Sequence, residues 1–283
     1  MNIKNIIILV IAIVLFSQCE KMDPEESYSN EVIALDNAQA ALYFHTVFRE
    51  AENAWAFIDS KHYVSGEYDD PKMNPATPTI SKVLVYDEDK KSVTIRYNAW
   101  VSDNLLLIGN IKVEFNKDSY CRDAQKATIY LTDFSINWQN VTGRSQIIYA
   151  KVNGNDHYSY ILYDPSSIHK EGDNKPELIS GGISNGQYER IKGKTTLLQD
   201  DDEWAYSGTM KGRLREDPKL SFTNKVLAPY TENGETKDER VFYAMGCKTA
   251  KHGISQITIS GRPDIKYRYA CSEIEFVSTT NVH

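Results

Sequence analysis

Apolar and polar residues change their spacing several times along this chain, and each change predicts a different element. The first stretch, Met1–Cys19, carries one charge, Lys4, before an apolar run from Ile6 to Phe16. A membrane-spanning helix needs about 20 consecutive apolar residues, so this run is too short to cross a bilayer. A lone basic residue, a short apolar core and small or polar residues before a cysteine are typical of a lipoprotein signal peptide. We therefore expect cleavage after residue 18.

Cleavage at this point predicts that Cys19 becomes the lipid-attachment residue of the mature chain. A diacylglycerol and an amide-linked acyl chain such as palmitate would then anchor the protein, since stable attachment requires more than one acyl chain. The following segment, Glu20–Asn30, is acidic, contains Pro24 and lacks hydrophobic periodicity. Such a composition predicts a flexible tether over residues 19–30. The membrane is the first partner that the sequence indicates.

From Glu31 to Asp59 the apolar residues recur three and four positions apart, which predicts an amphipathic helix. The apolar stripe consists of Phe44, Val47, Phe48, Ala51, Ala54, Trp55 and Ile58. His45, Arg49, Glu52 and Asn53 fall on or near the opposite flank. Because such residues are common on helix surfaces, we interpret this flank as a solvated face and not as a catalytic site.

After a loop over His62–Thr79, rich in proline, the chain reads as strands and turns to its end. Two Asn-Gly pairs, Asn153–Gly154 and Asn233–Gly234, predict tight hairpins, because this dipeptide favours the turn that matches strand twist. One long strand is expected over Phe134–Ala150, and a loop over Asp164–Pro176. The regular turns predict a mainly β fold, an antiparallel meander forming a β-sandwich or a curved half-barrel, in a single domain over residues 31–283.

The composition of the chain excludes some classes of function. The 283 residues carry a formal net charge of −7, and the sequence contains no block of Lys and Arg. A protein that binds nucleic acid needs a net positive charge or a patch of basic residues, so we expect no nucleic-acid partner. No phosphate-binding loop is present, and we expect no cofactor.

The four cysteines are Cys19, Cys121, Cys247 and Cys271. If Cys19 is acylated, three remain, which leaves one thiol free or paired between chains. Cys247 and Cys271 each lie near one side of a predicted hairpin, and they are the expected disulfide. Neither paired cysteines nor paired histidines occur at zinc-binding spacing, so no metal site is expected. The acidic run over residues 200–203 is interpreted as a solvated turn, because it lacks the spacing of a calcium loop.

No residue can be assigned a catalytic role from the sequence. A GxSxG nucleophile motif is missing and the six histidines are scattered. Binding of a glycan requires exposed aromatic faces, whereas the same residues also serve in cores and cross-strand pairs. The candidates for ligand-facing aromatic residues are Trp138, Tyr158, Tyr160, Tyr163 and Trp204.

Several short strand motifs resemble a family of uncharacterised β-rich lipoproteins of Bacteroidota. The resemblance rests on Gly109–Phe115, Ala127–Leu131, Phe134–Asn137, Val141–Gly143, Trp204–Gly208, Gly212 and Val226–Pro229. Cys247 and Cys271 stand where the family carries two cysteines. The chain departs from the family at Tyr267–Ser272, where the family has glycines and an acidic residue. The resemblance implies a β-rich lipoprotein of the outer membrane, facing the periplasm or the cell surface, with no known activity.

Together these patterns predict a lipid-anchored lipoprotein of the cell envelope, in the outer membrane and exposed at the cell surface or facing the periplasm. The function expected is non-catalytic binding of a glycan, an envelope protein or another ligand. The alternatives are a structural or assembly component of the envelope, and a hydrolase.

Overall fold

The computed structural model of this chain describes residues 24–61, 65–69, 81–102, 104–116, 126–170, 179–193, 202–213, 219–244 and 246–277. The chain divides into two compact units, Met1–Ile33 and Ala34–His283.

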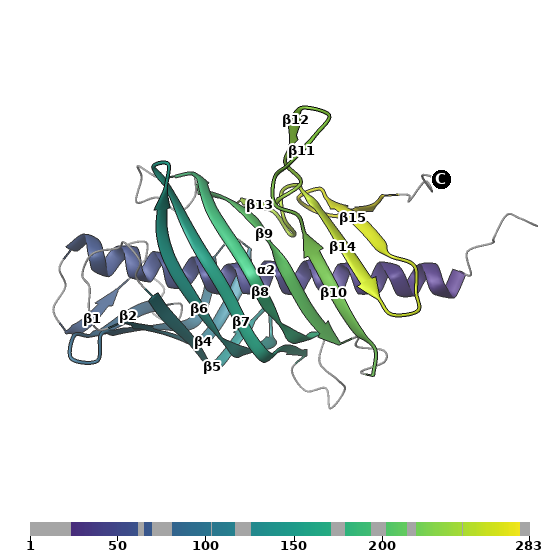
Figure 1. The fold of residues 1–283 in the computed structure, drawn as a ribbon. Coiled ribbons are helices and arrows are strands. Elements are labelled where there is room, and N and C mark those ends of the chain that lie inside the picture. The colour runs from purple at the N-terminus through teal and green to yellow at the C-terminus, as the bar shows by residue number, and fades with distance from the viewer. Residues whose placement is uncertain are drawn as a thin grey trace, which may run out of the picture. The chain divides into compact units, whose positions relative to one another are not determined.

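The described residues form one helix and sixteen strands (Figure 1). The helix is α2 (Pro24–Lys61). The strands are β1 (Gly66–Asp69), β2 (Ser81–Asp87), β3 (Ser92–Ser102), β4 (Leu105–Phe115), β5 (Lys126–Ile136), β6 (Gln139–Val152), β7 (Asn155–Lys170), β8 (Ile179–Lys192), β9 (Glu203–Arg213), β10 (Ser221–Val226), β11 (Tyr230–Glu232), β12 (Glu235–Lys237), β13 (Val241–Ala244), β14 (Ile254–Ile259), β15 (Ile265–Tyr269) and β16 (Ile274–Phe276).

Fourteen of the described strands belong to one antiparallel sheet, in which β1 to β10 follow one another in chain order. Strands β14, β15 and β16 continue the sheet beyond β10, and β13 pairs with β9. The predicted fold class, a mainly β antiparallel meander with an N-terminal helix, is confirmed. The sheet is continuous and curved (Figure 1), because bulges interrupt its register at several strand pairs and bend it.

Helix α2 begins at Pro24, seven residues before the predicted start at Glu31. Part of the segment expected to be a tether is therefore helical. Proline suits the first helical turn, because its fixed φ is compatible with the helix and its missing N–H would have had no partner there.

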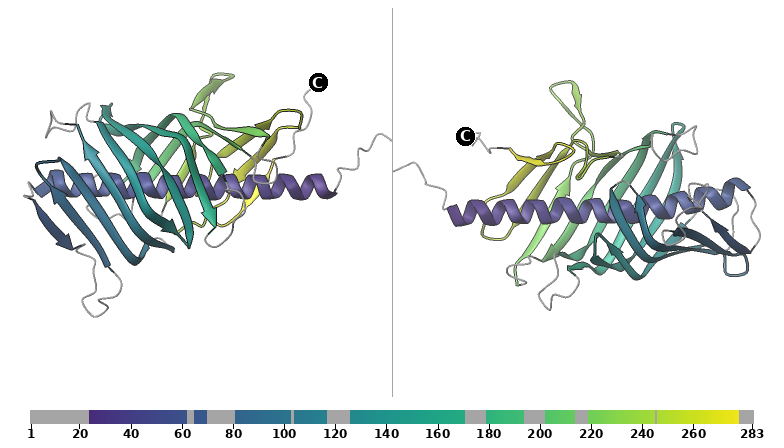
Figure 2. Two further views of the ribbon diagram at one scale, coloured as in Figure 1. Left: turned by 90° about the horizontal axis from the view of Figure 1, so that it is seen from below. Right: turned by 180° about the vertical axis from the view of Figure 1, so that it is seen from behind.

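From Ala34 onward, α2 crosses one face of the sheet (Figure 2). Phe48 lies at the centre of this contact. Its ring is stacked on Tyr188 with 4.0 Å between the ring centroids, and it meets Tyr158 and Trp204 edge-on at 5.4 and 5.2 Å. The hydrophobic core is thus aromatic, and it fills the space between the helix and strands β7 to β9.

Three local predictions differ from the structure. The predicted strand over Phe134–Ala150 is two strands, because the chain turns at Asn137 and Trp138. Strand β7 continues through residues 164–170, where a loop was expected, and β1 lies within the predicted loop after the helix. The turn at Asn137 lacks the glycine that marks the hairpins at Asn153–Gly154 and Asn233–Gly234, so its signal in the sequence is weak.

Candidate functional site

The helix flank predicted to be solvated is buried, and that prediction is wrong for His45, Arg49 and Glu52. These side chains are 3%, 4% and 1% exposed, and Glu50 beside them is fully buried. The reason is that the sheet supplies polar partners for the helix. Lys82 Nζ lies 2.8 Å from Glu50 Oε2, and the Tyr97 hydroxyl donates a hydrogen bond of 2.8 Å to the same oxygen.

Burial alone would raise the pKa of Glu50. Lys82 and Arg49 outweigh burial, because their positive charges favour the carboxylate, and the pKa of Glu50 lies below its ordinary value. The carboxylate therefore stays charged inside the protein. Its partner on the sheet, Lys82, is itself only 4% exposed.

Glu52 forms a second buried ion pair two residues further along the helix. Arg190 Nη2 lies 2.6 Å from Glu52 Oε2, and the Tyr158 hydroxyl donates a hydrogen bond of 2.8 Å to Glu52 Oε1. The Arg190 guanidinium also lies over the Trp204 ring at 4.6 Å from its centroid. Successive acidic residues of α2 are thus held by β2 and by β8, which fixes the helix along the sheet.

The two buried ion pairs join the helix to the sheet. A small cavity between the helix and the sheet is lined by Ala41, Tyr188, Tyr206, Met210 and Tyr269, among others. It has room for about one water molecule, far below the several hundred Å³ of a ligand pocket. This cavity is therefore too small for a ligand of ordinary size.

The aromatic residues proposed to face a ligand divide into three groups. Tyr158, Tyr160 and Trp204 are buried at 2%, 0% and 1% exposure, so a ligand-facing role for these three is wrong. They form the core against α2. Tyr163 is half-buried, and Arg144 on the neighbouring strand lies over its ring at 4.5 Å. Trp138 is 59% exposed, and it is the most accessible of the five candidates.

Trp138 occupies a strained backbone position. Asn137 and Trp138 are the two central residues of the β5–β6 hairpin, and their φ angles are 50° and 63°. Two positive φ values define the type I′ turn, in which glycine is strongly preferred at the second position. A large aromatic residue in this conformation costs of order 1–3 kcal/mol. In this strained turn the indole ring of Trp138 is exposed to solvent at the tip of the hairpin.

A second exposed apolar residue, Val101, lies beside this turn. Val101 pairs with Leu106 across the β3–β4 hairpin and is 59% exposed. The Leu106 N–H donates to the side-chain oxygen of Asn137, and the Asn137 N–H donates to the Leu106 carbonyl, both at 2.9 Å. The two hairpin tips are therefore joined. We call Val101, Leu106, Asn137 and Trp138 the hairpin-tip patch.

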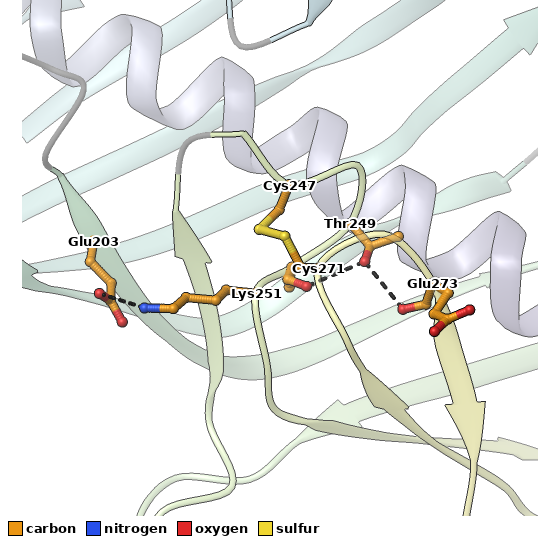
Figure 3. Close-up of a disulfide and its surroundings, with 7 residues drawn as sticks. Glu203, Cys247, Thr249, Lys251, Cys271 and Glu273 are labelled. Atoms are coloured by element: carbon orange, nitrogen blue, oxygen red, sulfur yellow. Dashed lines mark hydrogen bonds and ion pairs between the residues drawn. A yellow bond between two sulfur atoms is a disulfide. The ribbon is translucent and has the colours of Figure 1, made fainter.

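The predicted disulfide between Cys247 and Cys271 is present (Figure 3), with an S–S distance of 2.17 Å. It ties the segment after β13 to the segment after β15. Around it, the Thr249 N–H donates to the Cys271 carbonyl at 2.9 Å, and Lys251 Nζ lies 3.1 Å from Glu203 Oε2. A disulfide persists in an oxidising compartment such as the periplasm or the cell surface.

Other predicted positions fall outside the described residues: Cys19, Cys121 and the signal peptide. The acidic run is described only at Asp202 and Glu203, and both are buried, so the predicted solvated turn is wrong there. Glu203 is charge-paired with Lys192 and Lys251 at 2.8 and 3.1 Å. Across the described ranges, His, Cys, Asp and Glu form no group that would hold a metal ion. In the same ranges no helix has the length and apolar character needed to cross a membrane.

Comparisons with protein-family models, with curated proteins and with solved structures found no match to this chain.

Proposed function

We propose that this protein is a lipid-anchored lipoprotein of the cell envelope that binds a ligand without catalysis, and that the ligand is a glycan. The observation that carries binding is Trp138, an exposed indole held in a left-handed conformation at the β5–β6 turn. Unfavourable backbone conformations persist where function requires them. An indole face suits the apolar C–H face of a sugar ring.

The proposal of an envelope location rests on the amino-terminal sequence and on the disulfide. The run before Cys19 fits a lipoprotein signal, as in the Bacteroidota family that the chain resembles. The Cys247–Cys271 bridge suits an oxidising compartment outside the cytoplasm. The alternatives, a structural component of the envelope and a hydrolase, have less support, because an enzyme needs converging reactive groups in a cleft.

Binding is tested by screening the purified full chain against a panel of glycans, then measuring affinity for any hit. Trp138→Gly keeps the turn and removes the ring, so we expect it to lose binding by about tenfold or more, the usual effect of losing a stacked aromatic contact. Phe276→Ala is the matched control, since Phe276 is a 48% exposed aromatic residue on β16. Equal affinities in the wild type and Trp138→Gly would rule out this site.

The anchor is tested separately by replacing Cys19 with Ala. Without the acylated cysteine, the protein should leave the membrane fraction and appear in the soluble fraction. A Cys121→Ala variant serves as the control and should remain membrane-bound. If Cys19→Ala stays with the membrane, the lipid-anchor assignment is wrong.

A further inference from the structure

The outward face of β9, β10, β14 and β15 carries basic residues that are far apart in the sequence. Burial alternates along β10, β14 and β15 and along the last part of β9, so one set of positions there faces the core and the other faces solvent. The outward positions include five cations: Lys211, Arg213, Lys225, Lys266 and Arg268. We call these five residues the basic stripe. The four strands lie side by side in the sheet (Figure 1).

Strand register arranges the five cations along a diagonal. Lys225 pairs with Gln256, which pairs in turn with Lys266, so these residues share one row across three strands. On the other side of Lys225, the neighbouring strand β9 carries Lys211. Lys211 pairs with Thr223, so it lies two residues away from the row that contains Lys225. Arg213 and Arg268 extend the line at its two ends. With strands about 4.8 Å apart and a rise of about 3.4 Å per residue, the stripe is roughly 25 Å long.

Acidic side chains among the described residues neutralise the basic stripe only in part. None of its five side chains forms an ion pair with another described residue, whereas many other cations of the chain are paired. Two acidic residues lie near its β15 end. Glu275 stands opposite Arg268 on β16, and Asp264 accepts a hydrogen bond from Gln256 at 2.6 Å. Five unpaired cations on one face stand out in a chain whose net charge is −7.

We propose that the basic stripe binds an acidic polysaccharide, one whose sugars carry carboxylate or sulfate groups. Charge complementarity with a linear polyanion follows from the diagonal arrangement of the cations. The outward residues between them carry hydroxyl or amide groups that hydrogen-bond to sugar hydroxyls, namely Thr209, Ser221, Thr223, Gln256 and Thr258.

Single-stranded nucleic acid and an anionic membrane fit this face less well. Proteins that bind single strands stack the bases on aromatic side chains, and the outward positions named above include no aromatic residue. Peripheral membrane binding combines basic residues with apolar ones that enter the bilayer, and the row of Thr209, Lys225, Gln256 and Lys266 is polar throughout. This inference is independent of the proposed glycan site, because Trp138 lies on the β5–β6 turn.

The test uses the purified full chain and polygalacturonate, with neutral dextran as the uncharged comparison. The expected result is binding to polygalacturonate that weakens steeply as the salt concentration rises, because counterions are released when cations meet a polyanion. The triple variant Lys211→Gln, Lys225→Gln, Lys266→Gln should lose about tenfold or more in affinity, with a shallower salt dependence.

The matched control is the triple variant Lys126→Gln, Lys151→Gln, Lys248→Gln. These three lysines are exposed on other parts of the chain, so the control has the same net charge as the stripe variant. Its affinity should stay within about twofold of the wild type, since only the cations in contact with the polyanion contribute strongly. Equal losses in the two triple variants would overturn the proposal, because they would indicate a general charge effect.

Three further outcomes would also overturn it. The first is no binding to polygalacturonate at low salt. The second is equally strong binding to single-stranded oligothymidylate, and the third is equally strong binding to vesicles containing phosphatidylglycerol. The triple variant of the stripe distinguishes the two proposed sites, because it should keep the affinity for any uncharged glycan that binds at Trp138.

Discussion

Arg190 Nη2 lies 2.6 Å from Glu52 Oε2, and this ion pair joins the sheet to the helix inside the protein. Both side chains are nearly excluded from solvent, at 9% and 1% exposure. A buried pair of this kind adds little net stability compared with apolar residues, but breaking it leaves a buried charge without its partner. Its structural effect is to specify where the helix lies along the strands.

Glu52→Gln should therefore lower the free energy of unfolding by about 3–5 kcal/mol. Glu67→Gln is the control, because Glu67 and Arg96 form an ion pair 3.0 Å long whose side chains are 62% and 55% exposed. That substitution should cost less than about 1 kcal/mol. Urea denaturation of the two variants measures the difference, and equal losses would contradict the burial argument.

Trp138→Gly should raise the free energy of unfolding by about 1 kcal/mol or more, because glycine adopts positive φ without strain. Trp138→Ala should bring little gain, since alanine keeps the steric penalty of the left-handed conformation. Denaturant midpoints of the two variants provide the comparison. A strong destabilisation by Trp138→Gly would mean that the ring packs against the protein and does not serve a ligand.

The stability of the protein should fall in mild acid because of His45. Burial first, and the charge of Arg49 second, lower the pKa of His45 well below its ordinary value of 6.5. Below pH 6.5 the unfolded chain takes up a proton that the folded protein does not, so the free energy of unfolding is constant above this pH and decreases below it. The decrease is at most about 1.4 kcal/mol per pH unit for one group.

His45→Phe tests the origin of this decrease. The imidazole is stacked on Tyr243 with 4.0 Å between ring centroids, and it also lies near Tyr188 and Phe48. A phenyl ring keeps these aromatic contacts but does not titrate. The variant should lose less stability than the wild type between pH 7 and pH 5 in urea denaturation. If His45→Phe and the wild type lose the same stability, other titratable groups cause the decrease.

Replacing Cys247 and Cys271 together by Ser should lower the free energy of unfolding by about 3 kcal/mol. The bridge closes a loop of 24 residues. Its removal destabilises the protein because the unfolded chain gains conformational entropy. Alkylation of the wild type under denaturing, non-reducing conditions gives an independent check. Modification of either residue would contradict the disulfide.

The local spacing of residues was enough to predict the elements that are bounded by strong turn signals. Asn153–Gly154 and Asn233–Gly234 close hairpins as predicted, because this dipeptide favours one turn type regardless of its surroundings. The N-terminal helix and the antiparallel strands were likewise predictable, since their periodicity is a property of neighbouring residues. The turn at Asn137 and Trp138 was missed, because the structure imposes positive φ on a residue that does not favour it.

Only the tertiary structure decided which residues share a face or an interior. The sequence placed His45, Arg49 and Glu52 on a solvated flank, whereas the curved sheet surrounds this part of the helix and provides Lys82 and Arg190 as partners. The sequence also contained no basic block, yet strand register gathers five cations into one stripe. The physical reason is the same in both cases. Pairing between strands brings together side chains that are distant in the chain, whereas the pattern within one strand shows only which face each side chain takes.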